Sequence, residues 1–262
     1  MSKLSFFVTL CYGIPILLPI YPIGLFISYL LKITKFDDAS DRINNLLAYL
    51  WYRIFFILAR RKLVLDLEKW KPENKNRFLI CNHTNSLEVP LVVALPFLSG
   101  SKDVHLSYLG GDIIQRYKII PLMMHARIVE AVIYSEKKPN FRNFKTDVLR
   151  VLKKRSIFLY PEGERTYTEE IRPFQTGVLK IAYKFQIDLD VFVVSGLMGF
   201  SDESIYSEMA KDKKVYFSFC GTVSAKDHID FETYLNHAQK LMKDKKKELE
   251  MLHNSSFNGK SF

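Results

Sequence analysis

The chain has 262 residues, of which 48% are hydrophobic, and its formal net charge is +10. This length and apolar content exclude a disordered chain and suffice for one large domain with a packed core. The positive charge favours anionic partners such as phospholipid headgroups or coenzyme phosphates, and the sequence contains no motif of a recognised nucleic-acid-binding module.

The N-terminal region predicts contact with a membrane. No charged residue occurs in the run 4–31, which is long enough to cross a bilayer and too long for a simple signal peptide. Prolines and glycines interrupt the run, so a spanning helix and a hairpin within one leaflet both remain open. We assign residues 1–60 to a hydrophobic membrane anchor and residues 61–262 to a separate globular domain.

A second segment of this anchor, 43–59, has apolar residues at helical spacing, which makes one broad stripe. Trp51 and Tyr52 are rings of the kind that prefer a membrane interface. The segment therefore predicts either an interfacial helix or a helix packed on the domain.

From residue 61 onward, short apolar runs alternate with helical patterns. Seven runs predict strands, at 62–67, 77–81, 104–109, 131–134, 156–160, 191–195 and 215–220. Four stretches predict helices, at 87–95, 143–153, 177–185 and 231–252. This alternation predicts an α/β fold with a mostly parallel mixed sheet flanked by helices, preceded by an N-terminal membrane-docking helical segment. The Lys-rich stretch 240–247 predicts a solvated helix face or a contact with anionic lipid.

The cysteines and histidines argue against a disulfide framework or a metal site. Cys11, Cys81 and Cys220 have no paired spacing, and the six histidines are scattered. A zinc site needs clustered Cys or His ligands. We therefore expect buried thiols, no metal and no redox cofactor.

The first block with chemical content is Asn-His-Thr-Asn-Ser-Leu-Glu at 82–88, after the second predicted strand. If His83 lies in the loop and Glu88 in the first helical turn after an Asn85 cap, the carboxylate can reach the imidazole. An imidazole can take a proton from an alcohol, and a carboxylate on its other nitrogen stabilises the imidazolium. We interpret His83 as a general base and Glu88 as its orienter. A helix cap beside an ordinary loop histidine is the alternative.

The second block is Tyr-Pro-Glu-Gly-Glu-Arg-Thr at 160–166, after the fifth predicted strand. Gly163 permits a sharp turn and close approach of the backbone to a ligand. Arg165 can hold a phosphate through two parallel hydrogen bonds, and Thr166 adds a hydroxyl donor. The block therefore predicts an anion site, with a β-turn that carries a solvent-facing arginine as the alternative.

The two blocks, in this order and at this distance, resemble those of the glycerophospholipid acyltransferase family, the lysophosphatidic acid acyltransferases in particular. In that family an Asn-His-x4-Asp block carries the catalytic dyad and a Phe-Pro-Glu-Gly-Thr-Arg-Ser block helps to hold the phosphate of the acceptor. The resemblance covers about residues 61–200. It implies that His83 and Glu88 are catalytic. It also implies a set of substrate-binding residues: Lys137, Glu162, Gly163, Arg165 and Thr166.

The departures from the family pattern concern the acceptor more than the catalytic pair. Glu88 replaces the usual Asp and is one methylene longer. Glu164 stands where Thr is usual and would bring a negative charge to the anion site. Lys137 stands about where an Arg is expected, and Gln175 where Lys is frequent. A lysine lacks the fork that grips a phosphate at two points.

The resemblance implies acyl transfer from acyl-CoA or acyl carrier protein to the free hydroxyl of a lysophospholipid. We expect 1-acylglycerol 3-phosphate as acceptor and phosphatidic acid as product. Lysophosphatidylinositol or lysophosphatidylglycerol is the alternative acceptor, and a non-catalytic lipid-binding membrane protein is the alternative class. The expected location is a bacterial inner membrane or the endoplasmic reticulum, with the active domain on the cytoplasmic side.

Overall fold

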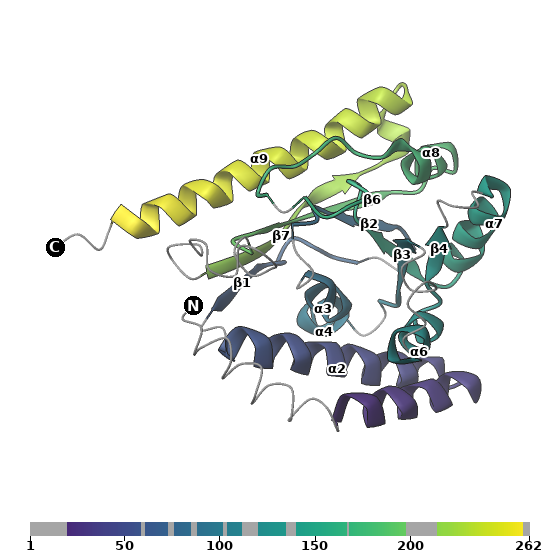
Figure 1. The fold of residues 1–262 in the computed structure, drawn as a ribbon. Helices are drawn as coiled ribbons and strands as arrows, with labels where there is room; N and C mark the ends of the chain where they lie inside the picture. Colours follow the sequence, from purple (N-terminus) through teal and green to yellow (C-terminus); the bar gives the residue numbers. More distant parts are fainter. Residues whose placement is uncertain are drawn as a thin grey trace.

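Seven strands form one sheet in the order β1-β7-β6-β2-β5-β3-β4. Figure 1 shows the sheet between two layers of helices. The computed structural model describes residues 20–58, 61–72, 76–84, 88–101, 104–111, 120–134, 140–166, 168–197 and 214–258. Cys11, Asn85 and Lys137 lie outside the described residues, as does the first part of the predicted anchor, residues 1–19.

All seven predicted strands are confirmed, with ends that shift by a few residues. They are β1 Lys62–Asp66, β2 Phe78–Cys81, β3 Leu106–Gly111, β4 Val132–Tyr134, β5 Ser156–Leu159, β6 Leu189–Ser195 and β7 Lys214–Val223. β7 pairs antiparallel with β6 and parallel with β1, so β1 and β7 run against the other five. The predicted mostly parallel mixed sheet is therefore confirmed.

Helices cover both faces of the sheet. One face carries α7 Phe141–Leu152, α8 Thr176–Lys184, the short 3-10 helix Ala225–Asp227 and α9 Phe231–Asn258. The other carries α2 Asp37–Leu58, α3 Glu88–Val93, α4 Leu95–Leu98 and α6 Ile120–Ile128. Because both faces are covered, β2, β5 and β6 are fully buried, which explains the short continuous apolar runs 78–81, 157–159 and 191–194 within them.

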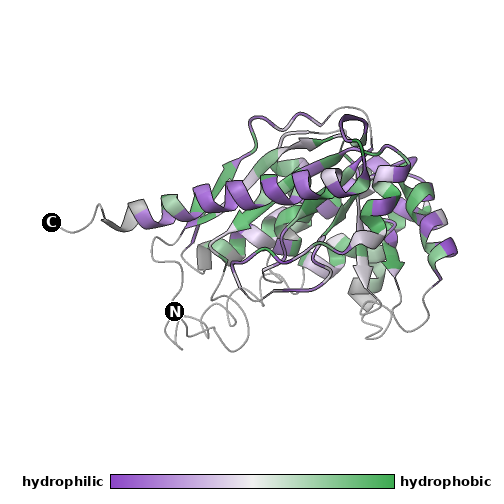
Figure 2. Cartoon of the chain, turned by 90° about the horizontal axis from the view of Figure 1, so that it is seen from above, coloured by the Kyte–Doolittle hydropathy of each residue, from purple (hydrophilic) through white to green (hydrophobic). Residues whose placement is uncertain are grey.

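The helix predictions hold with two differences. The predicted helix 87–95 is two short helices, α3 and α4, and α6 was not predicted. α6 has Pro121 in its first turn, where a missing N–H costs nothing, so the proline does not mark a loop there. α9 lies across the sheet and presents hydrophilic residues along much of its outer side, above strands that are mainly hydrophobic (Figure 2).

The N-terminal part consists of a helix over residues 20–33 followed by α2. Ala48, Tyr52 and Phe56 of α2 are buried in the cluster beneath the sheet. Of the two interpretations for the segment 43–59, the structure therefore shows a helix packed on the domain. Within the described residues, no helix has both the length and the hydropathy needed for a membrane crossing.

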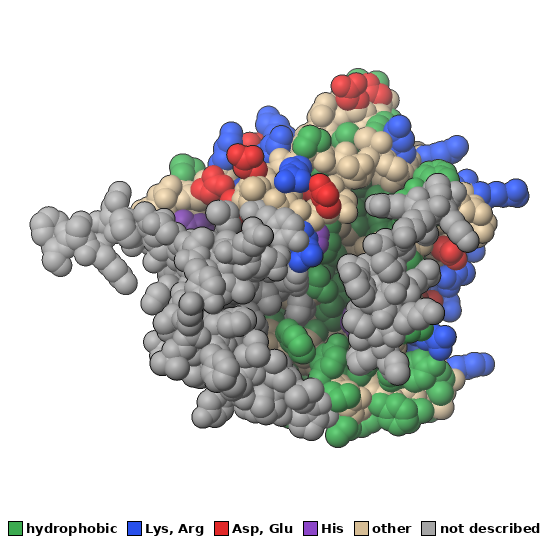
Figure 3. Space-filling model, in the orientation of Figure 1, with side chains coloured by type: hydrophobic (Ala, Val, Ile, Leu, Met, Phe, Trp, Pro, Cys, Tyr) green, Lys and Arg blue, Asp and Glu red, His purple; other side chains and the backbone are tan. Residues whose placement is uncertain are grey.

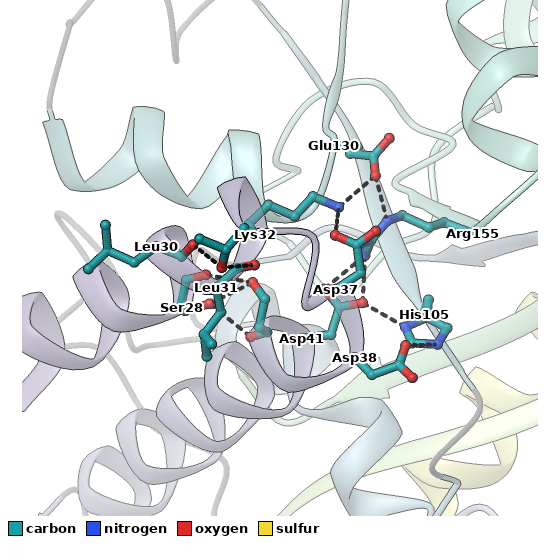
Figure 4. Close-up of polar contacts among 12 residues, drawn as sticks. Ser28, Leu30, Leu31, Lys32, Asp37, Asp38, Asp41, His105, Glu130 and Arg155 are labelled. Atoms are coloured by element: carbon teal, nitrogen blue, oxygen red, sulfur yellow. Dashed lines mark hydrogen bonds and ion pairs between the residues drawn. The ribbon is translucent and has the colours of Figure 1, made fainter.

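A charged network fastens this N-terminal part to the sheet (Figure 4). The buried Asp41 of α2 accepts hydrogen bonds from Arg155 Nη1 at 2.9 and 3.0 Å and lies 2.6 Å from His105 Nδ1. Glu130 accepts from Arg155 Nε at 3.3 Å and from Lys32 Nζ at 2.7 Å. The hydrogen bond to Asp41 raises the pKa of His105.

The position of this network is set by the strands that follow it. His105 and Arg155 directly precede β3 and β5, so the network occupies the amino edge of the sheet. Removing one member of a buried ion pair typically costs about 3–5 kcal/mol. The network therefore fixes the N-terminal helices relative to the sheet while leaving the opposite, carboxyl edge free for other residues.

Candidate active site

The two sequence blocks meet at the carboxyl edge of the sheet. Asn82 and His83 directly follow β2, and the block 160–166 directly follows β5. β2 and β5 are parallel neighbours, with Ile80 opposite Leu159. Because parallel strands end at the same edge, residues about 80 positions apart in the sequence come together where α/β proteins commonly bind ligands.

His83 and Glu88 form the predicted pair. The Nδ1 atom of His83 lies 2.9 Å from Glu88 Oε2, and Glu88 Oε1 accepts the N–H of Thr84 at 2.7 Å. The Glu88 side chain is 1% exposed and that of His83 is 15% exposed. A carboxylate at Nδ1 stabilises the tautomer with its proton there, so Nε2 is left as the proton acceptor. Glu88 thus contacts both the imidazole of His83 and the backbone N–H of Thr84, while the predicted Asn85 cap lies outside the described residues.

The environment keeps the imidazole of His83 neutral. Burial, and to a smaller extent the guanidinium of Arg165, lowers the pKa of His83 to about 4, although the carboxylate of Glu162 acts in the opposite direction. At pH 7 the ring is therefore in the form that can accept a proton. The neighbouring Glu88 carboxylate is in place to stabilise the imidazolium once the proton has been transferred.

The second block holds the backbone of His83. Glu162 Oε1 accepts the N–H of His83 at 2.8 Å, and the N–H of Thr166 donates to the carbonyl of His83 at 2.8 Å. Glu162 Oε2 accepts the N–H of Arg172, also at 2.8 Å. Glu162 and Thr166 are both buried. These contacts position His83. The expected contact of Glu162 and Thr166 with the acceptor stays a prediction that these contacts do not support.

Asn82 anchors the residue before the imidazole. Its Nδ2 donates to the carbonyl of Val194 at 3.0 Å, and its Oδ1 accepts the N–H of Val194 at 2.8 Å. The side-chain amide thus acts as an additional peptide group that extends the β2–β6 pairing beyond Cys81. The motif in the sequence does not predict this role of Asn82, because the role depends on the pairing of β2 with β6.

Tyr160 covers one face of the imidazole. The rings of Tyr160 and His83 are stacked, with centroids 3.8 Å apart and planes 11° apart. The Tyr160 hydroxyl is buried and has no hydrogen-bond partner among the described residues. The ring therefore contributes to the burial that lowers the pKa of His83.

Gly163 makes the turn of the second block. Its φ is +81°, and its N–H donates to the carbonyl of Tyr160 at 3.1 Å. A Cβ at this position would lie 2.8 Å from Cγ of Gln175. Any other residue would be strained here, both by its backbone conformation and by this contact. Gln175, which replaces a frequent lysine of the family, thus packs on the turn.

The charged residues of the second block are arranged differently from expectation. Glu164 is 72% exposed and forms an ion pair with Arg172 at 2.9 Å, and Arg172 Nη2 donates to the carbonyl of Thr166 at 3.2 Å. The negative charge of Glu164 is thus offset by a neighbouring guanidinium. Arg165 is partly buried and acts electrostatically on His83. Sequence reasoning missed Arg172, because nothing near it in the chain distinguishes it from other surface arginines.

The described residues contain no group of three or more His, Cys, Asp or Glu side chains arranged to hold a metal ion. In the same part of the chain, Cys81 and Cys220 are free thiols, and burial raises the pKa of both. The chemistry that the His83–Glu88 contact can support is proton transfer at the imidazole, beside the cationic side chain of Arg165.

Comparisons with known proteins identify the family and the fold. The model of the family described as Acyltransferase matches residues 64–195, which include both blocks. The crystal structure of the 1-acyl-sn-glycerophosphate (LPA) acyltransferase PlsC from Thermotoga maritima is similar, with a TM-score of 0.72 and 16% identity over 95% of this chain and 98% of that chain. At this identity the likeness shows a shared fold. No curated protein sequence matches the chain. Because the family model spans half of its length, the chain belongs to the acyltransferase family.

Proposed function

We propose that the protein transfers an acyl group from a thioester, carried by coenzyme A or acyl carrier protein, to the free hydroxyl of 1-acylglycerol 3-phosphate. The observation that carries this proposal is the His83–Glu88 pair at 2.9 Å, with a neutral imidazole beside the guanidinium of Arg165. The pair supplies a base, and the arginine supplies a cation for the phosphate of the acceptor.

In the proposed reaction, Nε2 of His83 takes the proton of the acceptor hydroxyl while the oxygen attacks the thioester carbonyl. The tetrahedral intermediate then collapses, the carbon–sulfur bond breaks, and the departing sulfur takes the proton from the imidazolium. The Glu88 carboxylate, bonded to Nδ1, stabilises that imidazolium between the two transfers. No covalent acyl-enzyme is needed, since the acceptor attacks directly.

We propose that Arg165 holds the phosphate, together with Lys137 and the backbone N–H groups near Gly163. A phosphomonoester suits this region because the Glu164 carboxylate is paired with Arg172, so its repulsion of a dianion is reduced. Lysophosphatidylinositol and lysophosphatidylglycerol, which are phosphodiesters, remain the competing acceptors in any assay.

We further propose that the N-terminal helix docks on the membrane that contains the acceptor. Its outward face and the following turn expose a row of large apolar residues, between 41% and 62% exposed: Ile20, Ile23, Phe26, Ile27, Leu30, Ile33 and Phe36. Figure 3 shows hydrophobic side chains gathered over this helix at the lower edge of the molecule. An apolar face of this kind is typical of interfacial helices. The proposed membrane is a bacterial inner membrane or the endoplasmic reticulum, with the site on the cytoplasmic side.

The test is a panel assay of the purified full-length protein with acyl-CoA and acyl carrier protein donors and lysolipid acceptors in vesicles. Turnover is expected with 1-acylglycerol 3-phosphate, and His83→Ala should reduce kcat by about 10²-fold or more while vesicle binding persists. Phe26→Asp in the exposed face should weaken vesicle binding, whereas Ile229→Asp, at an exposed apolar residue outside this helix, should leave it unchanged. Vesicle binding without thioester turnover in any combination would favour the non-catalytic lipid-binding alternative.

A further inference from the structure

The Lys-rich stretch of α9 contains a lysine that is turned into the protein. Lys246 is 3% exposed, although its neighbours in the stretch 240–247 suggest a solvated face. Lys245 fits that expectation better, since it forms ion pairs with Asp66 at 2.9 Å and Glu248 at 3.0 Å near the surface. For Lys246 the sequence prediction was wrong, because a charge run does not reveal which of its members faces the sheet.

The ammonium of Lys246 reaches the carboxyl edge of the sheet. Its Nζ donates to the carbonyl of Val194 at 3.0 Å and forms an ion pair with Glu169. Glu169 Oε1 in turn accepts the N–H of Gly196 at 3.3 Å. One buried cation thus connects α9, the end of β6 and the segment that follows the second block. A buried charge is tolerated only when it is paired and hydrogen-bonded, and both conditions hold here.

The carbonyl of Val194 is shared with the active site. It accepts Nδ2 of Asn82 and Nζ of Lys246, each at 3.0 Å. Asn82 directly precedes His83, so only this carbonyl and the Asn82 side chain separate the ammonium from the backbone of the base. Lys246 is also connected to the second block through the chain, because its partner Glu169 lies three positions before Arg172, whose N–H donates to Glu162 Oε2.

We propose that Lys246 is a positioning residue for His83, an inference that rests on the proposed function of His83 as the general base. The ammonium fixes the end of β6 and the segment 168–172, which hold His83 through Asn82 and Glu162 respectively. Because proton transfer demands close alignment, displacement of the base by a fraction of an ångström lowers kcat. Loss of the Lys246 ammonium should therefore lower kcat and leave the KM for the acceptor unchanged, because Lys246 is buried behind β6.

The test uses Lys246→Met combined with Glu169→Gln. The single variant Lys246→Met removes the ammonium from a partly buried carboxylate and is expected to lower stability. In the double variant both charges are gone, and the Gln oxygen can still accept the N–H of Gly196. The double variant should have a melting temperature close to that of the wild type, a kcat reduced by about tenfold or more and an unchanged acceptor KM. Lys245→Met, the adjacent lysine on the same helix, is the matched control and should retain the wild-type kcat.

A second measurement reports on His83 without turnover. In protein labelled with 15N-histidine, the His83 resonances, assigned through the His83→Asn variant, give its tautomer and its hydrogen bond to Glu88. We expect them to shift or broaden in the double variant and to remain unchanged in Lys245→Met. If the wild type shows no thioester turnover, the proposed function fails while this spectrum still tests the role of Lys246. A folded double variant with both wild-type kcat and wild-type His83 resonances would overturn the inference and leave Lys246 as part of the core.

Discussion

The backbone N–H of His83 donates to Oε1 of Glu162 at 2.8 Å, across 79 positions of sequence. The carbonyl of His83 is held by the same block, through the N–H of Thr166. The first block therefore supplies the reactive imidazole, and the second determines where that imidazole lies. A block that the family resemblance connects with the phosphate of the acceptor also positions the proposed general base.

This relationship predicts the effect of Glu162→Gln. A glutamine keeps one acceptor oxygen but brings an amide N–H₂ against either the His83 or the Arg172 backbone N–H. We expect a loss of about 1–3 kcal/mol in the free energy of unfolding and a lower kcat with unchanged acceptor KM. Chemical denaturation and steady-state kinetics measure both. A raised acceptor KM with normal kcat would instead support the direct contact with the acceptor that the sequence suggested.

A second prediction separates the two contacts of Glu88. Glu88→Gln keeps an oxygen for the N–H of Thr84 but cannot stabilise an imidazolium, so kcat should fall by about 10²-fold with little change in stability. Glu88→Asp, which restores the commoner family residue, is the control and should retain much of the activity. Equal kcat for Glu88→Gln and wild type would mean that Glu88 serves only the backbone.

The pH dependence of activity follows from the pKa of His83, which burial lowers to about 4. The imidazole remains unprotonated well below pH 6.5, so the acid limb of kcat/KM should lie below the usual histidine range. Rates measured from pH 4.5 to 8 in vesicles of constant composition test this. An acid limb centred at pH 6.5 or above would contradict the structural environment of the ring.

The lowered pKa of His83 also makes the free energy of unfolding depend on pH. Burial also lowers the pKa of His125 to about 4. In the unfolded chain both histidines titrate near pH 6.5, so the unfolded state binds more protons between pH 4 and 6.5. The contribution of the two neutral rings to stability is full above pH 6.5 and is lost as the pH falls towards 4. Urea unfolding across this range measures the loss, and His125→Asn should remove part of the slope.

Arg165 and Glu164 of the second block predict differences in acceptor kinetics. Arg165→Ala should raise the KM for the lysolipid more than the KM for the thioester, and Arg165→Lys should restore binding only in part, because an ammonium lacks the bidentate fork. Glu164→Thr removes the carboxylate that pairs with Arg172. It should therefore increase the preference for lysophosphatidic acid over lysophosphatidylinositol or lysophosphatidylglycerol. If Arg165→Ala changes the thioester KM alone, Arg165 binds the donor.

The buried hydroxyl of Tyr160 predicts a substitution that stabilises the protein. Tyr160→Phe keeps the ring that stacks on His83 and removes an oxygen that has no partner among the described residues. An unsatisfied buried hydroxyl costs about 1–3 kcal/mol, so the variant should be more stable by about 1 kcal/mol at unchanged kcat. Thermal unfolding and kinetics provide the readout. A specific rise in a substrate KM would show that the hydroxyl binds a ligand.

Much of the fold was accessible from the sequence because its signals are local. Buried parallel strands leave continuous apolar runs, so all seven strands could be located. His83 and Glu88 lie five positions apart across a strand–helix junction, and that geometry follows from the local chain. The helix α6 escaped prediction, since a proline near its start resembles a break in structure when the packing of this segment against α2 is unknown.

The tertiary structure decided which of these residues support one another. Pairing of β2 with β5 brings Glu162 to the backbone of His83, and pairing of β2 with β6 brings Val194 to Asn82. Packing of α9 on β6 selects Lys246 from a run of similar lysines. The sequence determined the residue types and the approximate positions of the strands. Strand order and helix packing, which depend on contacts between distant segments, brought together the proposed base, its carboxylate partner and the residues that hold them in place.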